Sequence, residues 1–203
     1  PLTSNSPFYA NQLEGVYAPD IGKSQSLLAS IGYFDSDNNK YLDLGGVEAS
    51  VTMLMQSGDS FSSIAKILSE QWQQIGVKTK TVVVPTATAL KAKVENGEYN
   101  LVAISTIGTD PSILNEFFVP AAQYSWSNYD DASLTSLLIQ GATNSDSQTR
   151  LAVYIQAQQQ IMDQALILPV GEPIRLDVVN TEVLTLSYDA LGIPILNNVT
   201  IAN

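Results

Sequence analysis

Residues 100–118, NLVAISTIGTDPSILNEFF, join an apolar strand to a polar turn and then to a helix. Residues 101–104 are typical of a buried strand. Pro111 suits a first helical turn, because the N–H that proline lacks would have no helical partner there. In open α/β sheets, ligands bind at the carboxyl ends of strands, in turns such as residues 105–110. Asp110 is therefore expected either to meet a ligand or only to cap the helix that begins at Pro111.

Composition excludes several classes of function. The 203 residues include 20 acidic and 9 basic side chains, which give a net charge of −11. Nucleic acid is therefore not an expected partner, since its phosphates need a basic face. Histidine and cysteine are both absent. This absence excludes Ser-His-Asp and Cys-His catalysis, disulfides, and metal sites built from these residues. No cofactor is expected.

Two features concern the ends and the membrane. The sequence contains no apolar run long enough to cross a bilayer. It begins at Pro1 without the charged and apolar segments of a secretory leader, and we expect it to be a piece of a longer protein.

Helical and strand patterns alternate along most of the chain. Helices are expected over residues 20–33, 59–75, 86–95, 132–140 and 147–165, and strands over 47–56, 77–84, 99–104, 167–170 and 174–179. This alternation predicts an α/β layer structure with a mainly parallel or mixed sheet flanked by helices. Residues 1–19 are expected to be an extended entry segment, and residues 20–203 a single α/β ligand-binding lobe.

A series of short motifs resembles one family of proteins when taken in order. These motifs are SLLASIGY (26–33), QSGD (56–59), QWQQIGV (71–77), GEYNL (97–101), IGTDP (107–111), YDDASLTSLL (129–138) and the helix exit over 156–169. In this order they resemble the C-terminal lobe of the extracytoplasmic solute-binding proteins of peptide and nickel ABC importers, family 5 or the oligopeptide-binding type. The resemblance covers about residues 7–200.

The resemblance implies a periplasmic-binding-protein-like (type II) lobe without chemistry of its own. It implies a peptide or peptide-like solute as ligand, bound in a cleft between this lobe and an N-terminal lobe that is not in the sequence. It also implies an ABC permease as partner and an extracytoplasmic location, either periplasmic or as a membrane-anchored lipoprotein. An acidic residue at the position of Asp110 pairs with the ligand's α-ammonium in peptide-binding members. Two positions depart from the pattern, with Ile107 in place of a tryptophan and Asp131-Ala132 in place of Asn-Pro.

Further candidate ligand-binding residues lie near the expected strand ends. Gln56 and Ser57 follow one strand, and Ser105, Thr106 and Thr109 follow another. Their amides and hydroxyls are suited either to hold a solute by hydrogen bonds or to satisfy the local turn. The aromatic residues of the next loop, Tyr124, Trp126 and Tyr129, are expected to form a wall of the cleft or to pin the loop to the domain.

The polar loop over residues 35–43 has a partial resemblance to a calcium-binding loop. Asp35, Asp37, Asn39 and Asp43 occupy positions 1, 3, 5 and 9 of an EF-hand pattern. Position 6 is Lys40 and position 12 is Gly46, where the pattern requires glycine and a bidentate glutamate. A solvated polar turn is therefore the preferred interpretation, and calcium the weaker one.

Three alternatives to a receptor lobe stay open at this point. A carboxylate-based hydrolase would need a converging acid pair, such as Asp110 with Glu116 or Asp59 with Glu98. A ligand-sensing domain of a bacterial transcription regulator would need an upstream DNA-binding segment. A structural lobe would bind a protein partner through an acidic face.

Overall fold

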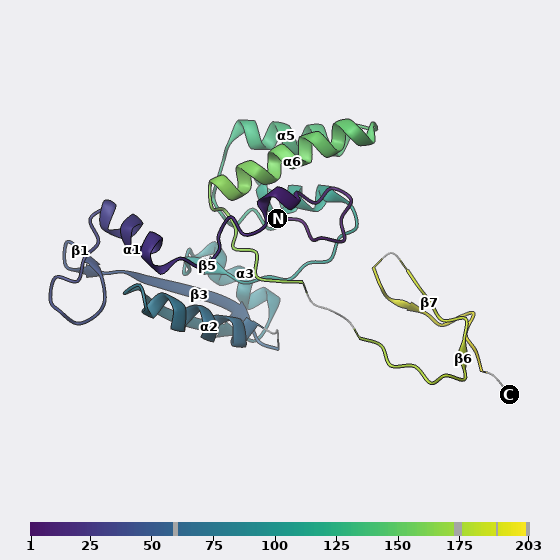
Figure 1. Ribbon diagram of the computed structural model, residues 1–203, viewed down its shortest axis with the longest axis horizontal. Helices are drawn as coiled ribbons and strands as arrows, with labels where there is room; N and C mark the ends of the chain where they lie inside the picture. The colour runs from purple at the N-terminus through teal and green to yellow at the C-terminus, as the bar shows by residue number, and fades with distance from the viewer. Residues whose placement is uncertain (59–60, 173–175, 190, 202–203) are drawn as a thin grey trace. The chain divides into compact units, whose positions relative to one another are not determined.

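The computed structural model describes residues 1–58, 61–172, 176–189 and 191–201 (Figure 1). The chain divides into two compact units. Residues 17–105 form one, called here the sheet unit. Residues 1–16 and 106–203 form the other, called the helical unit.

The sheet unit is built on a three-stranded parallel sheet. Its strands are β3 (Ser50–Gln56), β4 (Lys78–Val84) and β5 (Leu101–Val102), in the order β4-β3-β5. The helix α2 (Phe61–Gln73) connects β3 to β4, and α3 (Ala87–Glu95) connects β4 to β5. Parallel strands with helical crossovers confirm the predicted α/β class.

The central strand β3 is buried because helices cover both of its faces. Met53 and Met55 point to one face and pack with Ala65 of α2. Leu54 points to the opposite face, as alternation along a strand requires, and is fully buried. The helix α3, with Leu90 and Val94 buried, contacts β3 and β4.

The remaining elements of the sheet unit are a helix and a short hairpin. The helix α1 (Ile21–Ser30) begins at the cap Asp20, whose side chain accepts a hydrogen bond from the Lys23 N–H. No residue of α1 is buried. The strands β1 (Asp43–Leu44) and β2 (Val47–Glu48) pair antiparallel.

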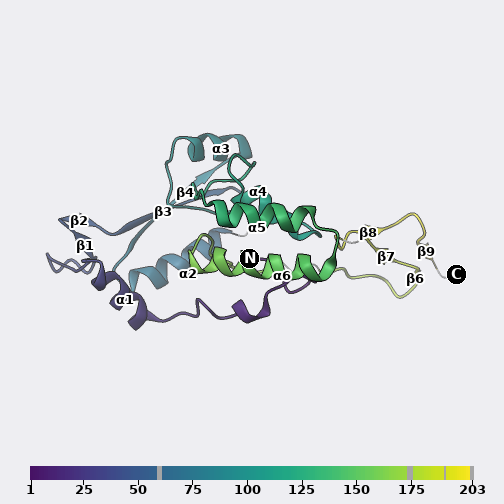
Figure 2. The same ribbon diagram turned by 90° about the horizontal axis from the view of Figure 1, so that it is seen from above.

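The helical unit is organised around two long helices, α5 (Ala132–Thr143) and α6 (Ser147–Asp163), which lie side by side (Figures 1 and 2). Two short elements precede them, the 3-10 helix η2 (Pro111–Leu114) and α4 (Asn115–Phe118). The shared core consists of buried residues from these four elements: Leu114, Phe118, Leu134, Leu138, Tyr154, Ala157 and Ile161.

The first residues of the chain pack against α6, more than a hundred positions away in sequence. Gln158 is fully buried, and its side-chain amide donates to the Phe8 carbonyl at 2.8 Å and accepts from the Leu2 N–H at 3.3 Å. Ala10 and Leu13 are buried beside Met162. Leu13 ends the 3-10 helix η1 (Asn11–Leu13). Residues 1–13 thus form part of the core of the helical unit.

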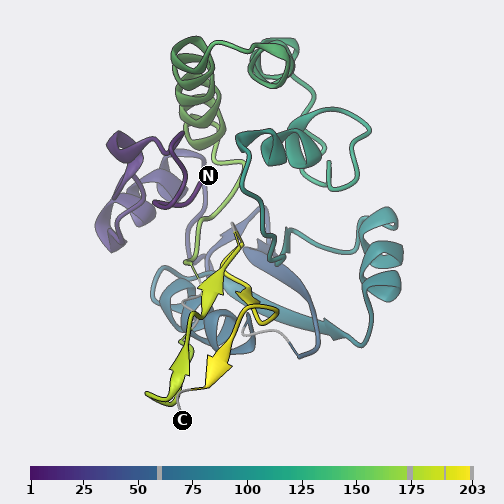
Figure 3. The same cartoon turned by 90° about the vertical axis from the view of Figure 1, so that its right-hand side faces the viewer.

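Residues beyond α6 differ from the sequence prediction. Residues 167–170 and 176–179 are irregular, so the strands predicted there are wrong, and residues 173–175 lie outside the described part. The strands form later: β6 (Val183–Leu184) pairs with β9 (Thr200–Ile201), and β7 (Ser187–Tyr188) with β8 (Pro194–Ile195), all antiparallel (yellow in Figure 3). Val178 is fully exposed and Leu176 is 84% exposed, so neither side chain packs into a hydrophobic core.

None of the helices in the described part of the chain is both long and apolar enough to span a bilayer.

Candidate functional site

The strand order β4-β3-β5 places a topological switch point between the parallel strands β3 and β5, since the two crossovers run in opposite directions across the sheet. The crossover after β3 leads outward to β4, and the crossover after β4 returns past β3 to β5. Ligands in open α/β folds bind outside the carboxyl ends of strands at such a point. Gln56 ends β3 at this edge, and Ser57 follows it as an exposed residue.

The turn after β3 is tied to the end of β4. The Ser57 N–H donates to the Val84 carbonyl at 2.8 Å, and its hydroxyl lies 3.5 Å from the Pro85 carbonyl. Ser57 therefore satisfies part of the local turn, while Gln56, only partly buried, keeps its side chain at the sheet edge. Ser105 follows β5 by three residues and is exposed. The sheet unit thus carries three of the predicted polar residues, with Gln56 at the end of β3 and Ser57 and Ser105 in the segments that follow β3 and β5.

The polar turn after β5 continues into the helical unit at Thr106. Residues 106–110 are all exposed. Asp110 is the N-cap of η2, and its carboxylate accepts a hydrogen bond from the Ser112 N–H at 2.9 Å. Pro111 occupies the first position of that helix and is buried. The capping role that the sequence allowed for Asp110 is confirmed.

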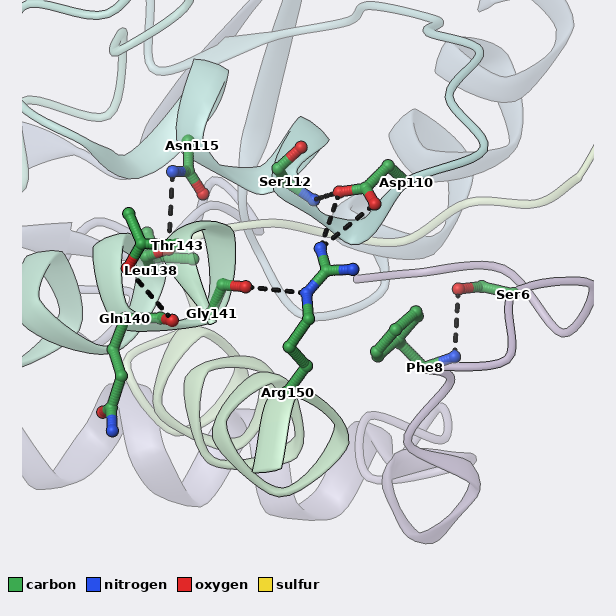
Figure 4. A network of polar contacts seen from close by, with 10 residues as sticks. All are labelled: Ser6, Phe8, Asp110, Ser112, Asn115, Leu138, Gln140, Gly141, Thr143 and Arg150. Atoms are coloured by element: carbon green, nitrogen blue, oxygen red, sulfur yellow. Dashed lines mark hydrogen bonds and ion pairs between the residues drawn. The ribbon is translucent and has the colours of Figure 1, made fainter. Parts of the chain in front are cut away.

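Asp110 also has an internal cation as its partner, Arg150 of α6 (Figure 4). Nη2 of Arg150 lies 3.0 Å from each carboxylate oxygen of Asp110. Nε of the same guanidinium donates to the Gly141 carbonyl of α5 at 2.8 Å. The guanidinium carbon lies 5.1 Å from the ring centre of Phe8 and 5.7 Å from that of Tyr154. Arg150 therefore joins η2, α5, α6 and the first residues of the chain.

This pairing perturbs the titration of both partners. Partial burial acts to raise the pKa of Asp110, but the hydrogen bonds from Ser112 and Arg150 outweigh it and hold that pKa below its usual value. The hydrogen bond to Asp110 in turn raises the pKa of Arg150, despite the opposing effect of burial. The two groups are therefore both charged over the whole neutral range.

The aromatic residues of the following loop contact one another. The rings of Tyr124 and Phe117 stack with centres 5.4 Å apart, and Trp126 meets Tyr124 edge-on at 5.2 Å. Tyr129 packs against the core of the helical unit. Tyr124 and Tyr129 thus hold the loop to its domain. Trp126 is partly exposed, so its use as a wall for a ligand stays a prediction.

The predicted polar loop of the sheet unit satisfies its own backbone. Asp35 accepts hydrogen bonds from the N–H groups of Asn39 and Lys40, at 3.0 and 2.9 Å. Asp43 is buried and accepts from both the N–H and the hydroxyl of Ser36, and these bonds lower the pKa of Asp43. Asp37 bonds the Asn39 N–H and side-chain amide. In the described residues, no three acidic side chains gather to hold a metal ion. The loop has the geometry of a self-capped polar turn.

The acid pairs proposed for hydrolysis are engaged elsewhere or lie outside the described residues. Asp110 pairs with Arg150, and Glu98 pairs with Lys93 at 2.6 Å. Asp59 falls outside the described part. Glu116 is exposed in the first turn of α4.

Three residues of α6 in this region were not identified from the sequence: Arg150, Tyr154 and Gln158. Arg150 and Tyr154 stand four residues apart on α6 and so share a helix face. That spacing is visible in the sequence, but their partners Asp110 and Phe8 are distant and carry no local signal. Gln158 lies one turn further along the same face, where a polar residue is expected to be exposed rather than buried.

Comparison with known proteins gives consistent matches. The family model described as bacterial extracellular solute-binding proteins, family 5 Middle, matches residues 1–129. Curated relatives include the oligopeptide-binding protein OppA of Lactococcus lactis subsp. lactis, 23% identical over 203 residues, which cover 91% of this chain and 33% of the relative. The chain thus spans about a third of the length of the curated relatives it matches.

Solved structures share the fold. The oligopeptide-binding protein AppA from Bacillus subtilis, in complex with a nonapeptide, superposes with a TM-score of 0.69 at 22% identity, covering 82% of this chain and 34% of that one. NikA from Brucella suis, in complex with Fe(III)-EDTA, superposes with a TM-score of 0.79 at 19% identity. This match covers 98% of this chain and 41% of NikA. The predicted type II periplasmic-binding-protein fold is confirmed.

Proposed function

Because this chain belongs to family 5 of the bacterial extracellular solute-binding proteins, we propose that it forms one ligand-binding lobe of the solute receptor of an ABC importer. The solute is a peptide or a peptide-like molecule, held without any chemical step. The observation that carries this proposal is the carboxyl edge of the parallel strands β3 and β5, where the strand order switches and Gln56 lies at the end of β3.

The residues at this edge suit a ligand that is recognised through its backbone. Amide and hydroxyl groups, such as those of Gln56 and Ser57, both donate and accept hydrogen bonds, as the N–H and C=O groups of a peptide require. Such bonds do not depend on the side chains of the ligand. Ser105, Thr109, Ile107 and Trp126 are proposed as further contacts, on the turn and the loop that follow β5. The nonapeptide named for the Bacillus subtilis neighbour supports a ligand of this class.

The proposed partners are a second lobe of the same receptor and a membrane permease. A second lobe would supply the other wall of the cleft, as in clamshell receptors that close around a ligand. Several apolar side chains beyond α6 are exposed, including Leu176, Val178 and Leu196. Their exposure supports a further protein partner whose surface covers them. The extracellular character of the family supports a location outside the cytoplasmic membrane, in the periplasm or on a lipid anchor.

Native mass spectrometry of the intact receptor, purified gently from its own cells, tests this proposal. We expect a ladder of adducts at peptide masses, reduced by the double substitution Gln56→Ala and Ser57→Ala. Gln71→Ala, at an exposed position late in α2, is the matched control and should leave the ladder unchanged. One discrete non-peptide adduct would overturn the ligand class, and the absence of any adduct would contradict the receptor function.

A further inference from the structure

The strand β4 forms an edge of the three-stranded sheet. In the described part of the chain, the order β4-β3-β5 gives β4 a single hydrogen-bonded neighbour, β3. The register between the two strands is continuous from Lys78 to Val84, so β4 contains no bulge. It contains no proline either, because Pro85 follows its last residue. Bulges and prolines both protect sheet edges from pairing with other strands, and β4 has neither.

Alternate residues of β4 direct their backbone groups away from β3. The Lys78 N–H donates to the Ala49 carbonyl at 2.8 Å, and the Ser57 N–H donates to the Val84 carbonyl at 2.8 Å. The even-numbered residues of β4 therefore face β3, since every second residue of a strand bonds to the same neighbour. The backbone N–H and C=O groups of the other three residues point to the open side of the sheet: Thr79, Thr81 and Val83.

The side chains of these three residues are β-branched and lie on the face of the sheet that carries α2. Thr81 is beside Met53 of β3 in the register, and Val83 is beside its neighbour Met55. Both methionines belong to the core cluster that includes Ala65 of α2. Thr81 is nevertheless exposed and Val83 is 51% exposed, so α2 leaves this strip of β4 partly uncovered. Such a strip suits a second strand, because β-branched side chains form favourable cross-strand pairs.

From this edge we propose that β4 pairs antiparallel with β4 of a second copy of the chain, about a two-fold axis at Thr81. In this register Thr81 lies opposite Thr81 of the second copy, and Thr79 lies opposite Val83. Residues with outward backbone groups then oppose one another, and each opposed pair exchanges two backbone hydrogen bonds. The two sheets become one continuous sheet. This inference goes beyond the proposed receptor function and does not depend on it.

The charges of the edge favour this register. Both lysines of β4, Lys78 and Lys80, lie opposite valines of the second copy. Like charges directly opposite each other would destabilise the pair, and this register avoids them. Lys78 is also ion-paired with Glu48 of its own unit.

The two neighbouring registers are less favourable. A two-fold axis at Lys80 would place that lysine opposite its own copy. An axis at Val82 would place Thr79 opposite Pro85, which has no N–H to donate. The sequence of the strand therefore selects the axis at Thr81.

Analytical ultracentrifugation of the intact receptor over a range of concentrations tests the proposed dimer. The measurement is made at about 0.15 M salt, because the net charge of −11 on each chain opposes association when it is not screened. We expect a reversible dimer. Thr81→Pro removes the central outward N–H but keeps the bonds to β3, and should raise the dissociation constant by about tenfold or more. Thr81→Val keeps the backbone and the branched side chain, and should stay within about twofold of wild type.

A receptor that stays monomeric at every concentration would overturn the inference. So would a dimer that a folded Thr81→Pro variant does not weaken, because the contact would then lie elsewhere. Circular dichroism shows whether the variants are folded. Neither result would touch the proposed receptor function, since solute binding is measured separately.

Introduced cysteines test the register itself, and decide the question if Thr81→Pro does not fold. This chain contains no cysteine. Opposed residues with Cα atoms about 5.5 Å apart are within reach of a disulfide. With oxidised glutathione as the electron acceptor, Thr81→Cys should form covalent dimers on a non-reducing gel. Thr79→Cys alone should not, whereas its mixture with Val83→Cys should. Equal cross-linking of Thr79→Cys and Thr81→Cys, or none in any variant, would contradict the proposed pairing.

Discussion

Arg150 and Asp110 are joined across 40 positions of sequence by a single nitrogen, Nη2, that lies 3.0 Å from both carboxylate oxygens. The same arginine bonds the last turn of α5 through the Gly141 carbonyl. The pair therefore connects the N-terminus of η2 to the interface between α5 and α6. Its removal should affect the stability of the whole helical unit and not only the turn that carries Asp110.

Replacement of Arg150 by methionine should lower the free energy of unfolding by about 1–2 kcal/mol, since the Gly141 carbonyl and Asp110 lose a shared donor. Arg150→Lys keeps the charge but cannot reach both partners with a planar fork, and should recover only part of the loss. Chemical denaturation followed by circular dichroism measures both. Equal stability of wild type and Arg150→Met would show that the pair is only a surface contact.

Gly141→Ala should destabilise the contact between α5 and α6. An added Cβ atom would lie 2.8 Å from Cε2 and Cζ of Tyr154, whose side chain is fully buried. Helix propensity favours alanine by about 1 kcal/mol, but overpacking of this kind costs about 1–3 kcal/mol, so a net loss is expected. Thermal denaturation measures it. Gly171→Ala is the control, because that position has open space around it and should change little.

Gln158→Leu should release the first residues of the chain from α6. The Leu2 N–H and the Phe8 carbonyl would both lose their partner, at a cost of about 2 kcal/mol. Hydrogen exchange followed by mass spectrometry should then show faster exchange over residues 1–13. Gln156→Leu, at an exposed position on the same helix, should leave that exchange unchanged.

Acid should weaken the helical unit through its helix caps. Asp110, Asp131 and Asp146 cap η2, α5 and α6. Each has its pKa lowered in the folded protein. For Asp131 the main cause is the hydrogen bond from the Leu134 N–H, and for Asp146 it is the hydrogen bond from the Thr149 hydroxyl. A lowered folded pKa adds stability that is complete above the unfolded value of about 3.9 and is lost as pH falls through the folded value.

The expected result is a melting temperature that is constant near neutral pH and falls below about pH 4. Asn caps helices about as well as Asp but does not titrate. The double substitution Asp131→Asn and Asp146→Asn should therefore make the decrease shallower. An unchanged decrease would mean that other carboxylates cause the acid sensitivity.

Local chemistry accounts for the parts of the fold that were predicted correctly. Helices begin where the sequence places Asp or Thr ahead of an apolar stripe, as at Asp20, Thr86 and Asp131, and each side chain accepts the expected backbone hydrogen bond. The strands β3 and β4 match runs of alternating or β-branched residues. These signals lie within a few residues of the feature that they specify.

Long-range pairing accounts for the parts that were missed. The apolar pattern of α6 predicts that Leu151, Ile155, Ile161 and Met162 point inward. Ile161 and Met162 are buried as predicted, but Leu151 and Ile155 are only partly buried. Tyr154 and Gln158 are fully buried, which the pattern did not predict. Gln158 can be buried because the backbone of residues 2 and 8 satisfies its amide. Similarly, the capping role of Asp110 follows from its neighbours, whereas its pairing with Arg150 does not.

The helical unit is assembled from two separate parts of the sequence, residues 1–16 and residues 106–203, with the whole sheet unit between them. The sheet unit comes from one continuous segment and can form its contacts as soon as residue 105 has left the ribosome. Leu2 and Phe8 are made before the sheet unit, whereas the glutamine that binds them is made about 150 residues later. During synthesis residues 1–13 therefore lack their partners on α6 until that helix emerges, and the helical unit is completed after the sheet unit.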